Sequence, residues 1–405
     1  MATYKEQNKL NVPNLRFPEF TGEWEECKLG DKCDLLCGYA FDGKDIVEQG
    51  TYLLMRGINI TEGIIRHSSE LDRYYTGSVN NLAKYKLTTG DLVIGMDGSK
   101  VGRNSAIVSP TENGSYLVQR VCRIKSCIGN DFIIQLVNNH KFHKYVDMVK
   151  TSSAIPHISL KDIQNFPIAV PSIQKEADKI SRLFHLLDER IATQSKIIDK
   201  LQSLIKGINQ NVFTDDGFNY MLKELCEIRS GYSGNQLTSM NGLKVSRIET
   251  ISGHKVNIER VGYVAPFASS ENYKLKIGDI LFSNINSVEY IGNTAFIEKD
   301  YGLYHGMNLL RLMPNKNIVI PLYLYLLLNT NRMQNHFKTI CNKAVSQASI
   351  NQTELGKTVV KIPSIKAQKQ ICELYQSLYN KLETENNAIS LLQKQKQYLL
   401  RQMFI

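Results

Sequence analysis

Hydrophobic residues recur at alternating steps of four and three in two separate stretches of the chain, a spacing that places one apolar stripe along a long helix. The second stretch repeats the first at an ungapped offset of 191 residues. The first stripe comprises Ile180, Phe184, Leu187, Ile191, Gln194, Ile198, Leu201, Ile205 and Ile208, and the second comprises Ile371, Tyr375, Leu378, Leu382, Glu385, Ile389, Leu392, Lys396, Leu399 and Met403. The repeat predicts two helices that pack against each other as a coiled coil.

A polar residue occupies the same central position in each stripe, Gln194 in the first and Glu385 in the second. A parallel pair of helices would place these two side chains close together, whereas an antiparallel pair would do so only if the helices cross at their centres. Buried polar groups at such positions fix the register of coiled coils. The alternative is that both residues are solvated and have no role.

Short runs of β-branched and aromatic residues, separated by Gly and Asn, precede each helix and predict a small β-rich domain in each half. The best match pairs residues 87–94 with residues 275–282 at an offset of 188, and a Gly-Asp turn leads into a strand in both. The copies then diverge, over residues 95–104 in the first half and 283–287 in the second. One scaffold that carries two different loops predicts two specificities.

We therefore expect an α+β protein in which two pseudo-twofold-related globular units are separated by two long helices. Pro171 and Pro363 each end a strand and begin a long helix. In chain order, the expected parts are a first domain at 1–170 with a lead at 1–23, a central helix at 171–213, a second domain at 214–362 and a distal helix at 363–405.

The 405-residue chain carries a formal net charge of +10. An excess of Lys and Arg indicates a polyanionic partner such as nucleic acid, because these cations displace the counterions condensed on phosphates. Hydrophobic residues at 42% and charged residues at 22% are typical of a folded protein. The sequence shows no apolar run of membrane-spanning length and no secretory signal, so we expect a cytoplasmic protein with no membrane partner.

Eight cysteines form no CxxC pair, and only Cys27, Cys33 and Cys37 are clustered. A metal site there would need a fourth ligand, for which His67 is a candidate. Reduced cysteines used as small apolar residues are the favoured interpretation for a cytosolic chain.

Motifs of nucleotide, metal and methyl-transfer chemistry are absent from the sequence, which has no phosphate-binding loop, no His-Glu-x-x-His and no Asn/Asp-Pro-Pro-aromatic segment. Asp42-Gly43-Lys44, downstream of Asp31 and Asp34, has the minimal shape of a nuclease site. Such triplets arise readily by chance, and a turn is the favoured interpretation. We expect no catalytic residues, no metal and no cofactor in this chain.

The order of these features resembles the DNA-specificity subunit of type I restriction-modification enzymes over nearly the whole chain. The resemblance rests on residues 12–20, followed by Trp24 and residues 28–31, and on the domain exits at 171–176 and 363–368. The second half departs from the first because it lacks the tryptophan, and because the segment from its exit proline to the helical stripe is one residue shorter.

This resemblance implies that each half is a target recognition domain that reads one part of a bipartite DNA target, with the helices as spacer. It also implies docking of two modification (methyltransferase) subunits on the helices and association with motor-nuclease restriction subunits, in a system of phage defence. S-adenosylmethionine, ATP and Mg would then be bound by those partner subunits.

For DNA contact we select charged and polar residues of the predicted loops, because Arg can pair with guanine O6 and N7, Asn with adenine N6 and N7, and Lys with phosphates. Arg103, in the divergent loop, is the leading base reader, and Asn284 and Asn286 are candidates for reading adenine. Arg123 and Arg311 match at the 188 offset, which favours phosphate contact or the fold. The full set is Arg56, His67, Ser99, Lys100, Arg103, Asn104, Arg120 and Arg123 in the first half and Arg247, His254, Asn284, Asn286, His305, Asn308 and Arg311 in the second.

Two other functions remain open from the sequence. A coiled-coil adaptor or scaffold would use the helices for protein partners, and its basic charge would be incidental. A self-contained restriction or methyltransferase enzyme would need a cofactor motif that the sequence lacks.

Overall fold

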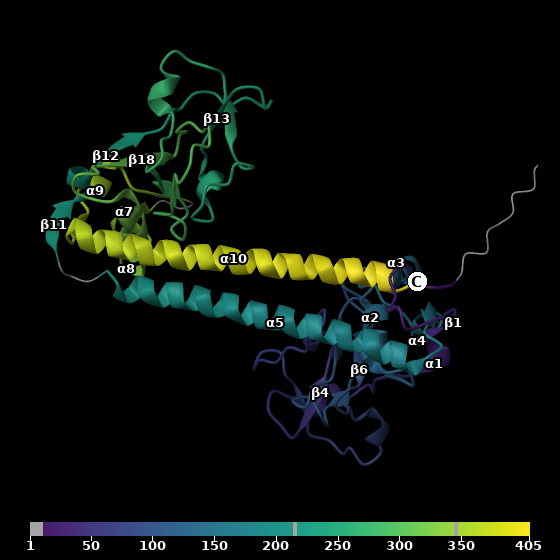
Figure 1. The fold of residues 1–405 in the computed structure, drawn as a ribbon. Coiled ribbons are helices and arrows are strands. Elements are labelled where there is room, and N and C mark those ends of the chain that lie inside the picture. The colour runs from purple at the N-terminus through teal and green to yellow at the C-terminus, as the bar shows by residue number, and fades with distance from the viewer. Residues whose placement is uncertain (1–10, 214–216, 344–346) are drawn as a thin grey trace, which may run out of the picture. The chain divides into compact units, whose positions relative to one another are not determined.

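The computed structural model describes residues 11–213, 217–343 and 347–405, and the chain forms two compact units (Figure 1). Unit 1 comprises residues up to 195 together with 387–405, and unit 2 comprises residues 196–386. The longest helices are α5 (Gln174–Asn211) and α10 (Ile365–Met403), and each contributes one segment to each unit.

Unit 1 is built around a four-stranded antiparallel sheet. Its strand order is β2-β9-β6-β7, that is Cys33–Cys37, Val121–Ser126, Leu92–Gly95 and Ser105–Ile107. A second sheet has the order β3-β5-β4-β8, that is Ile46–Val47, Tyr74–Tyr75, Tyr52–Met55 and Tyr116–Leu117. The short pair β1-β10 (Glu25–Lys28 and Pro167–Val170) and the helices α1 (Leu29–Lys32), α2 (Asn130–Val137), α3 (His140–Val149) and α4 (Leu160–Gln164) complete the unit.

Unit 2 repeats this plan. Its four-stranded sheet has the order β12-β18-β15-β17, that is Cys226–Ser230, Leu309–Pro314, Ile280–Ser283 and Thr294–Phe296. The smaller sheets are β11-β21 (Phe218–Met221 and Val359–Ile362), β13-β14 (Leu243–Val245 and Gly262–Val264) and β16-β20-β19 (Ile285–Asn286, Ala348–Ser349 and Asn342–Lys343). Its other helices are α6 (Leu222–Leu225), α7 (Pro321–Leu328), α8 (Asn331–Ile340) and α9 (Gln352–Gly356). The predicted duplication is confirmed in strand order as well as in sequence.

The Gly-Asp turn predicted in each half lies where expected. Gly90 and Gly278 both have positive φ, at 91° and 97°, a backbone conformation that glycine adopts without steric cost. The strands that follow, β6 and β15, are buried at every residue. Pro171 and Pro363 directly follow β10 and β21, so both strands end at the predicted residues.

The two long helices run antiparallel within each unit. In unit 1, Phe404, which follows the end of α10, packs 5.8 Å from Phe184 near the start of α5. In unit 2, the Tyr375 hydroxyl near the start of α10 donates to Asn209 Oδ1 near the end of α5. Of the two arrangements left open by the sequence, the antiparallel one is therefore found.

None of the predicted stripe residues is exposed, as expected for a helical stripe that packs against other parts of the protein. The buried ones are Ile180, Phe184, Leu187, Ile198, Ile205, Tyr375, Glu385 and Met403, and the half-buried ones are Ile191, Gln194, Leu201, Ile208, Ile371, Leu378, Leu382, Ile389, Leu392, Lys396 and Leu399.

The core of unit 1 joins segments from both ends of the described chain. The Trp24 ring lies 6.0 Å from Phe132 and 6.3 Å from Phe404. Its Nε1 donates to the carboxylate of Glu176, which is fully buried and also accepts two hydrogen bonds of 2.7 Å from Arg16. The first turn of α5 is thereby fixed to the segment before β1.

In unit 2 the first turn of α10 is fixed in a similar way, but without a tryptophan. At the position equivalent to the buried glutamate it has Gln368, which is also fully buried. Gln368 Oε1 accepts a hydrogen bond of 2.8 Å from the backbone of Ile320, and Nε2 donates to Pro363 O and Ile318 O. A neutral amide fits here because the backbone supplies both its donor and its acceptors, so no charge needs to be compensated.

Candidate nucleic-acid interface

Candidate residues of unit 1 follow the ends of two neighbouring strands. β4 and β8 pair in parallel, so the segments that leave them emerge side by side. Arg56 directly follows β4, is half-buried and donates from Nη1 to the carbonyl of Leu71. Arg120 lies in the short segment that leaves β8 and leads into β9, and its side chain is exposed. The two arginines therefore lie at the same edge of the small sheet.

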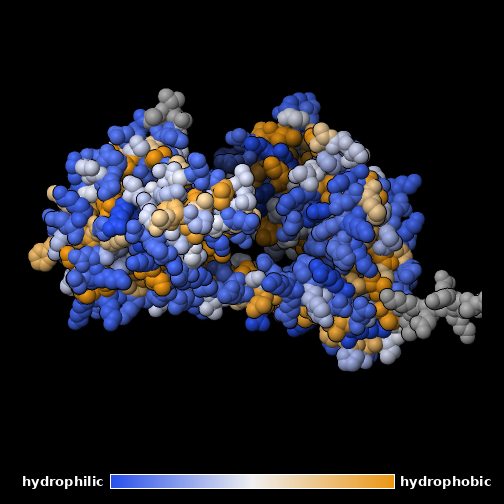
Figure 2. Space-filling view, turned by 90° about the horizontal axis from the view of Figure 1, so that it is seen from above, coloured by the Kyte–Doolittle hydropathy of each residue, from blue (hydrophilic) through white to orange (hydrophobic). Residues whose placement is uncertain are grey.

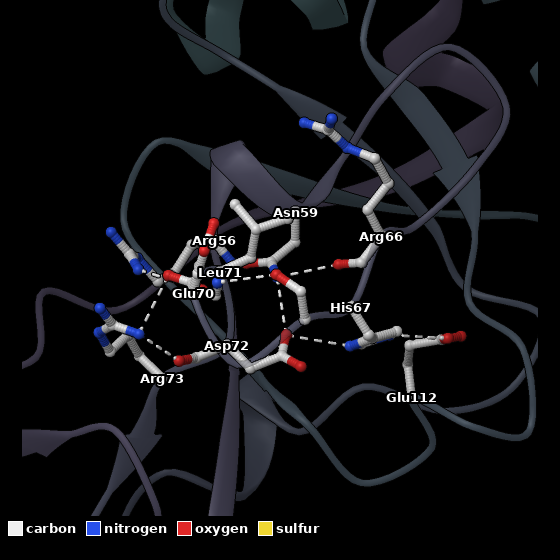
Figure 3. Close-up of polar contacts among 10 residues, drawn as sticks. Arg56, Asn59, Arg66, His67, Glu70, Leu71, Asp72, Arg73 and Glu112 are labelled. Atoms are coloured by element: carbon white, nitrogen blue, oxygen red, sulfur yellow. Dashed lines mark hydrogen bonds and ion pairs between the residues drawn. The ribbon is translucent and has the colours of Figure 1, made fainter. Parts of the chain in front are cut away.

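His67 is held between two carboxylates, as Figure 3 shows. Its Nδ1 lies 3.1 Å from Asp72 Oδ1, and its Nε2 lies 3.1 Å from Glu112 Oε1. Burial acts to raise the pKa of Glu112, but hydrogen bonds from Ser109 and His67 lower it below its ordinary value. Both ring nitrogens are engaged, so His67 joins two loops of the unit.

Arg123 and Arg311 are buried at equivalent positions of the four-stranded sheets, with 8% and 3% of their area exposed. Arg311 forms an ion pair of 2.6 Å with Asp279 and donates to the carbonyl of Asn272. Arg123 donates to the carbonyl of Lys84 at 2.9 Å. Of the two interpretations left open for this pair, the geometry favours a role in the fold over phosphate contact.

His305 is also enclosed, with 1% of its area exposed. Its Nε2 donates to the carbonyl of Leu309 at 3.0 Å. Burial lowers the pKa of His305 from 6.5 to about 4, so the ring is neutral near pH 7. The sequence placed this residue among the DNA contacts, but in the structure it is part of the protein interior.

The divergent loop of unit 1 has its cations in surface ion pairs. Arg103 Nη2 lies 2.7 Å from Asp147, and Lys100 Nζ lies 3.1 Å from Glu62. Exposed ion pairs of this kind contribute at most about 1 kcal/mol, so a phosphate or a base can compete for either side chain. Ser99 is exposed. Asn104 is half-buried, and its Oδ1 is buried without a hydrogen-bond partner.

The asparagines predicted to read adenine lie at the end of β15 and in β16. Asn286 donates to Ser283 Oγ and accepts from the backbone of Ser287. Asn284 has its Oδ1 buried without a hydrogen-bond partner. His254, on a neighbouring loop, is exposed and has a positive φ of 57°.

A polar hollow of about 390 Å³ lies at the equivalent strand edge of unit 2. Arg247 and Asn308, both exposed, lie on its wall. The complete lining is Ser233, Gly234, Asn235, Gln236, Arg247, Ile248, Glu249, Met307 and Asn308. Asn235 and Gln236 were not among the residues predicted from the sequence, although two consecutive amides that follow Gly231, Tyr232, Ser233 and Gly234 were a usable signal.

Two other kinds of site that the sequence raised, a metal site and a nuclease triplet, can be compared with the residues that the structure describes. No group of three or more His, Cys, Asp or Glu side chains there is arranged to hold a metal ion, and burial raises the pKa of Cys33 to about 11. Asp42 accepts a hydrogen bond from the backbone of Lys44, which makes the Asp-Gly-Lys triplet a turn. None of the described helices combines the length and the hydrophobicity that a membrane-spanning segment needs. On the face drawn in Figure 2, hydrophobic residues form small patches within a mostly hydrophilic surface.

Both halves of the chain match one family of known proteins. The sequence model of the family described as "Type I restriction modification DNA specificity domain" matches residues 21–203 and again residues 217–394. This chain belongs to that family. The double match of the specificity domain coincides with the duplicated fold.

Individual relatives are named as specificity subunits of type I restriction enzymes. The chain is 43% identical over 187 residues to the type I restriction enzyme MjaX specificity subunit of Methanocaldococcus jannaschii, a match that covers 45% of this chain and 44% of the relative's length. It is 23% identical over 355 residues to the EcoKI specificity subunit of Escherichia coli, which covers 80% of this chain and 76% of that relative. The first match thus spans less than half of the relative.

The fold matches solved structures over nearly its whole length. The type I restriction-modification S subunit from M. genitalium aligns with a TM-score of 0.61 at 16% identity, covering 97% of this chain and 99% of that one. At this identity the likeness concerns the fold of specificity-domain proteins.

Proposed function

We propose that this chain is the DNA-specificity subunit of a type I restriction-modification complex. The observation that carries the proposal is the duplicated specificity domain, in which one frame of strands supports two different sets of loops. In this proposal each unit reads one half of a bipartite double-stranded DNA target. The net charge of +10 supports a polyanionic ligand.

The chain would act without catalytic residues of its own, as one component of a complex with site-specific deoxyribonuclease and DNA adenine methyltransferase activities. Two modification subunits would dock on the long helices and bind S-adenosylmethionine, and motor-nuclease subunits would use ATP and Mg. Such a complex would work in the cytoplasm in defence against phage. Each modification subunit would dock on the segments of α5 and α10 in one unit, where exposed apolar side chains are present: Leu186 and Leu391 in unit 1, and Leu204 and Leu374 in unit 2.

The decisive experiment is methylation-motif mapping by long-read sequencing in a host that carries the cognate modification subunit, with and without this chain. We expect a bipartite methylated motif that appears only when the chain is present. A complex that assembles but methylates no new motif contradicts the proposal and favours an adaptor role. Robust methyl transfer or cleavage by the purified chain alone contradicts its non-catalytic character.

The proposal also assigns separate tasks to the parts of the chain. Exchanging residues 95–104 is expected to change one half of the motif only. Lengthening the helices by one turn, about 5.4 Å, is expected to change the spacer and to preserve both half-sites. A change in both halves after the loop exchange contradicts independent reading by the two units.

A further inference from the structure

The same unusual backbone turn occurs at one equivalent position of both units. Arg120 and Asn308, which are related by the 188 offset, have φ values of 70° and 64°. Each directly precedes the long central strand of its four-stranded sheet, β9 or β18. Among the residues that the structure describes, only these two and His254 combine a side chain beyond glycine with a positive φ.

The frame around this turn is duplicated as well. Tyr39 donates its backbone N–H to Leu117, and Tyr232 donates its own to His305, at 2.9 and 3.0 Å. The glycine before each tyrosine lies so close to the opposite strand that an added Cβ would be 2.1 Å from Val118 O in unit 1. Unit 2 has the same close approach, at 1.8 Å. The turn is therefore held in one geometry while its side chain differs.

Glycine would satisfy the backbone requirement of this turn at lower steric cost, since a Cβ is disfavoured at positive φ. Asparagine tolerates the conformation, but arginine has no such tendency. Backbone strain that persists at equivalent positions motivates a search for a role of the side chain. The unit 1 turn thus retains an arginine where its own backbone favours glycine.

The side chains of Arg120 and Asn308 are both exposed. Neither Arg120 nor Asn308 forms a side-chain hydrogen bond or ion pair within the described part of the chain. By contrast, Arg103 and Lys100 are already paired with carboxylates. A donor group that no protein partner engages can reach a ligand without first breaking an interaction.

A second residue beside each turn is shared. Arg56 follows β4 and Arg247 follows β13, both in extended conformation. The backbone N–H of each is bound by a buried side chain three residues on, Asn59 in unit 1 and Thr250 in unit 2. An arginine shared by two units that read different sequences suits contact with a phosphate, because phosphates carry no sequence information. The neighbouring residue that differs between the units, Arg120 or Asn308, is then the one available to read a base.

We propose that the residue in this left-handed turn is a specificity-determining base contact of each unit. Arg120 pairs with a guanine and Asn308 with an adenine, through the N7 edge of the base in the major groove. The inference rests on the proposed function, and it names two base readers within it. Arg103 and Asn284, in the divergent loops, then take supporting positions.

The test uses the full chain in complex with its modification subunit. Methylation-motif mapping with the wild-type chain first supplies the target sequence. The purified complexes are then titrated with DNA duplexes that carry this target or a version with one altered base pair. Arg120→Asn and Asn308→Arg are the informative variants, because each introduces a residue that the equivalent turn already accommodates. We expect Arg120→Asn to lose discrimination at one G·C pair of one half-site, by about 5- to 150-fold. Asn308→Arg is expected to do the same at one A·T pair of the other half-site.

Glycine variants keep the test independent of folding. Arg120→Gly and Asn308→Gly suit the backbone, so the complex should assemble and lose discrimination at the same single base pairs. Matched controls change a charge elsewhere: Lys144→Ala on α3, and Asn317→Arg in the turn beyond the far end of β18. The controls are expected to leave discrimination at every position unchanged.

Three outcomes overturn the inference: unchanged discrimination in all four variants, changes that fall in a single half-site for both positions, or a uniform loss of affinity with no change in discrimination. An unmodified chain that yields no bipartite motif contradicts the proposed function itself. A clear motif that all variants preserve contradicts only the two base contacts.

Discussion

Replacing Arg311 by methionine should destabilise unit 2 far more than the same replacement of its equivalent, Arg123, destabilises unit 1. Arg311 is paired at 2.6 Å with Asp279, and the two side chains are only 4% and 8% exposed. Methionine fills most of the arginine volume but leaves the carboxylate buried without its cation, which typically costs about 3–5 kcal/mol.

The equivalent arginine in unit 1 pairs with a different carboxylate, because Asp91, the counterpart of Asp279, pairs with Lys125 instead. Arg123 lies 3.5 Å from Asp34, whose side chain is 73% exposed and keeps its hydration when the arginine is removed. The main loss is then the hydrogen bond to the carbonyl of Lys84, about 1–2 kcal/mol. We therefore expect the two substitutions to differ by roughly 2–3 kcal/mol.

Urea unfolding of the full chain, followed by circular dichroism, measures both variants against the unmodified protein. The two units can unfold in separate transitions, so each variant is assigned to the transition that it shifts. DNA affinity is measured in parallel below the first transition. An Arg311→Met protein that stays within about 1 kcal/mol of the parent and yet loses DNA affinity would refute the structural role derived above.

Three further perturbations follow from the geometry. Arg120→Asn should raise the free energy of unfolding by up to about 1 kcal/mol, because asparagine tolerates positive φ, and unchanged or lower stability in urea would contradict the strain. Between pH 6.5 and 4 the histidine is protonated in the unfolded chain but stays neutral in the folded one, where burial lowers the pKa of His305 to about 4. The free energy of unfolding should therefore fall by up to about 3 kcal/mol as the pH falls from 6.5 toward 4, and this contribution is complete above pH 6.5. His305→Gln should flatten that part of the stability profile, and an identical profile would show that another group is responsible. Glu176→Gln should cost unit 1 about 3 kcal/mol in urea unfolding by leaving Arg16 without its carboxylate, and a loss below about 1 kcal/mol would mean that solvent replaces the pair.

The long helices and the duplication were predictable because both are periodic in the sequence. The stripe positions of α5 and α10 depend only on the repeat of the helix, and the strand that follows the Gly-Asp turn begins with three consecutive apolar residues in each half. The antiparallel direction was not predictable, because the spacing of apolar residues that begins at Ile180 or Ile371 is compatible with a partner helix in either direction.

The candidate site was predicted at the level of loops and less well at the level of side chains. Arg311 and His305 were selected as potential DNA contacts because they are polar. Their burial depends on partners distant in sequence, such as Asp279 for the arginine. The decisive property of Arg120 is a backbone angle, which an arginine in the sequence does not signal. The match between Arg123 and Arg311 was the one available sign that a charged residue belongs to the frame.

The core of unit 1 has a consequence for how the protein is made. Leu400, Met403 and Phe404 pack in the same cluster as Trp24 and Phe132, so the part of unit 1 that precedes unit 2 in the chain cannot complete its core until residues 400–404 have been translated. Unit 2, which lies within residues 196–386, has all its parts earlier. Folding during synthesis should therefore begin in the middle of the chain, and a nonsense codon before residue 387 should expose the hydrophobic interior of the unit that was synthesised first.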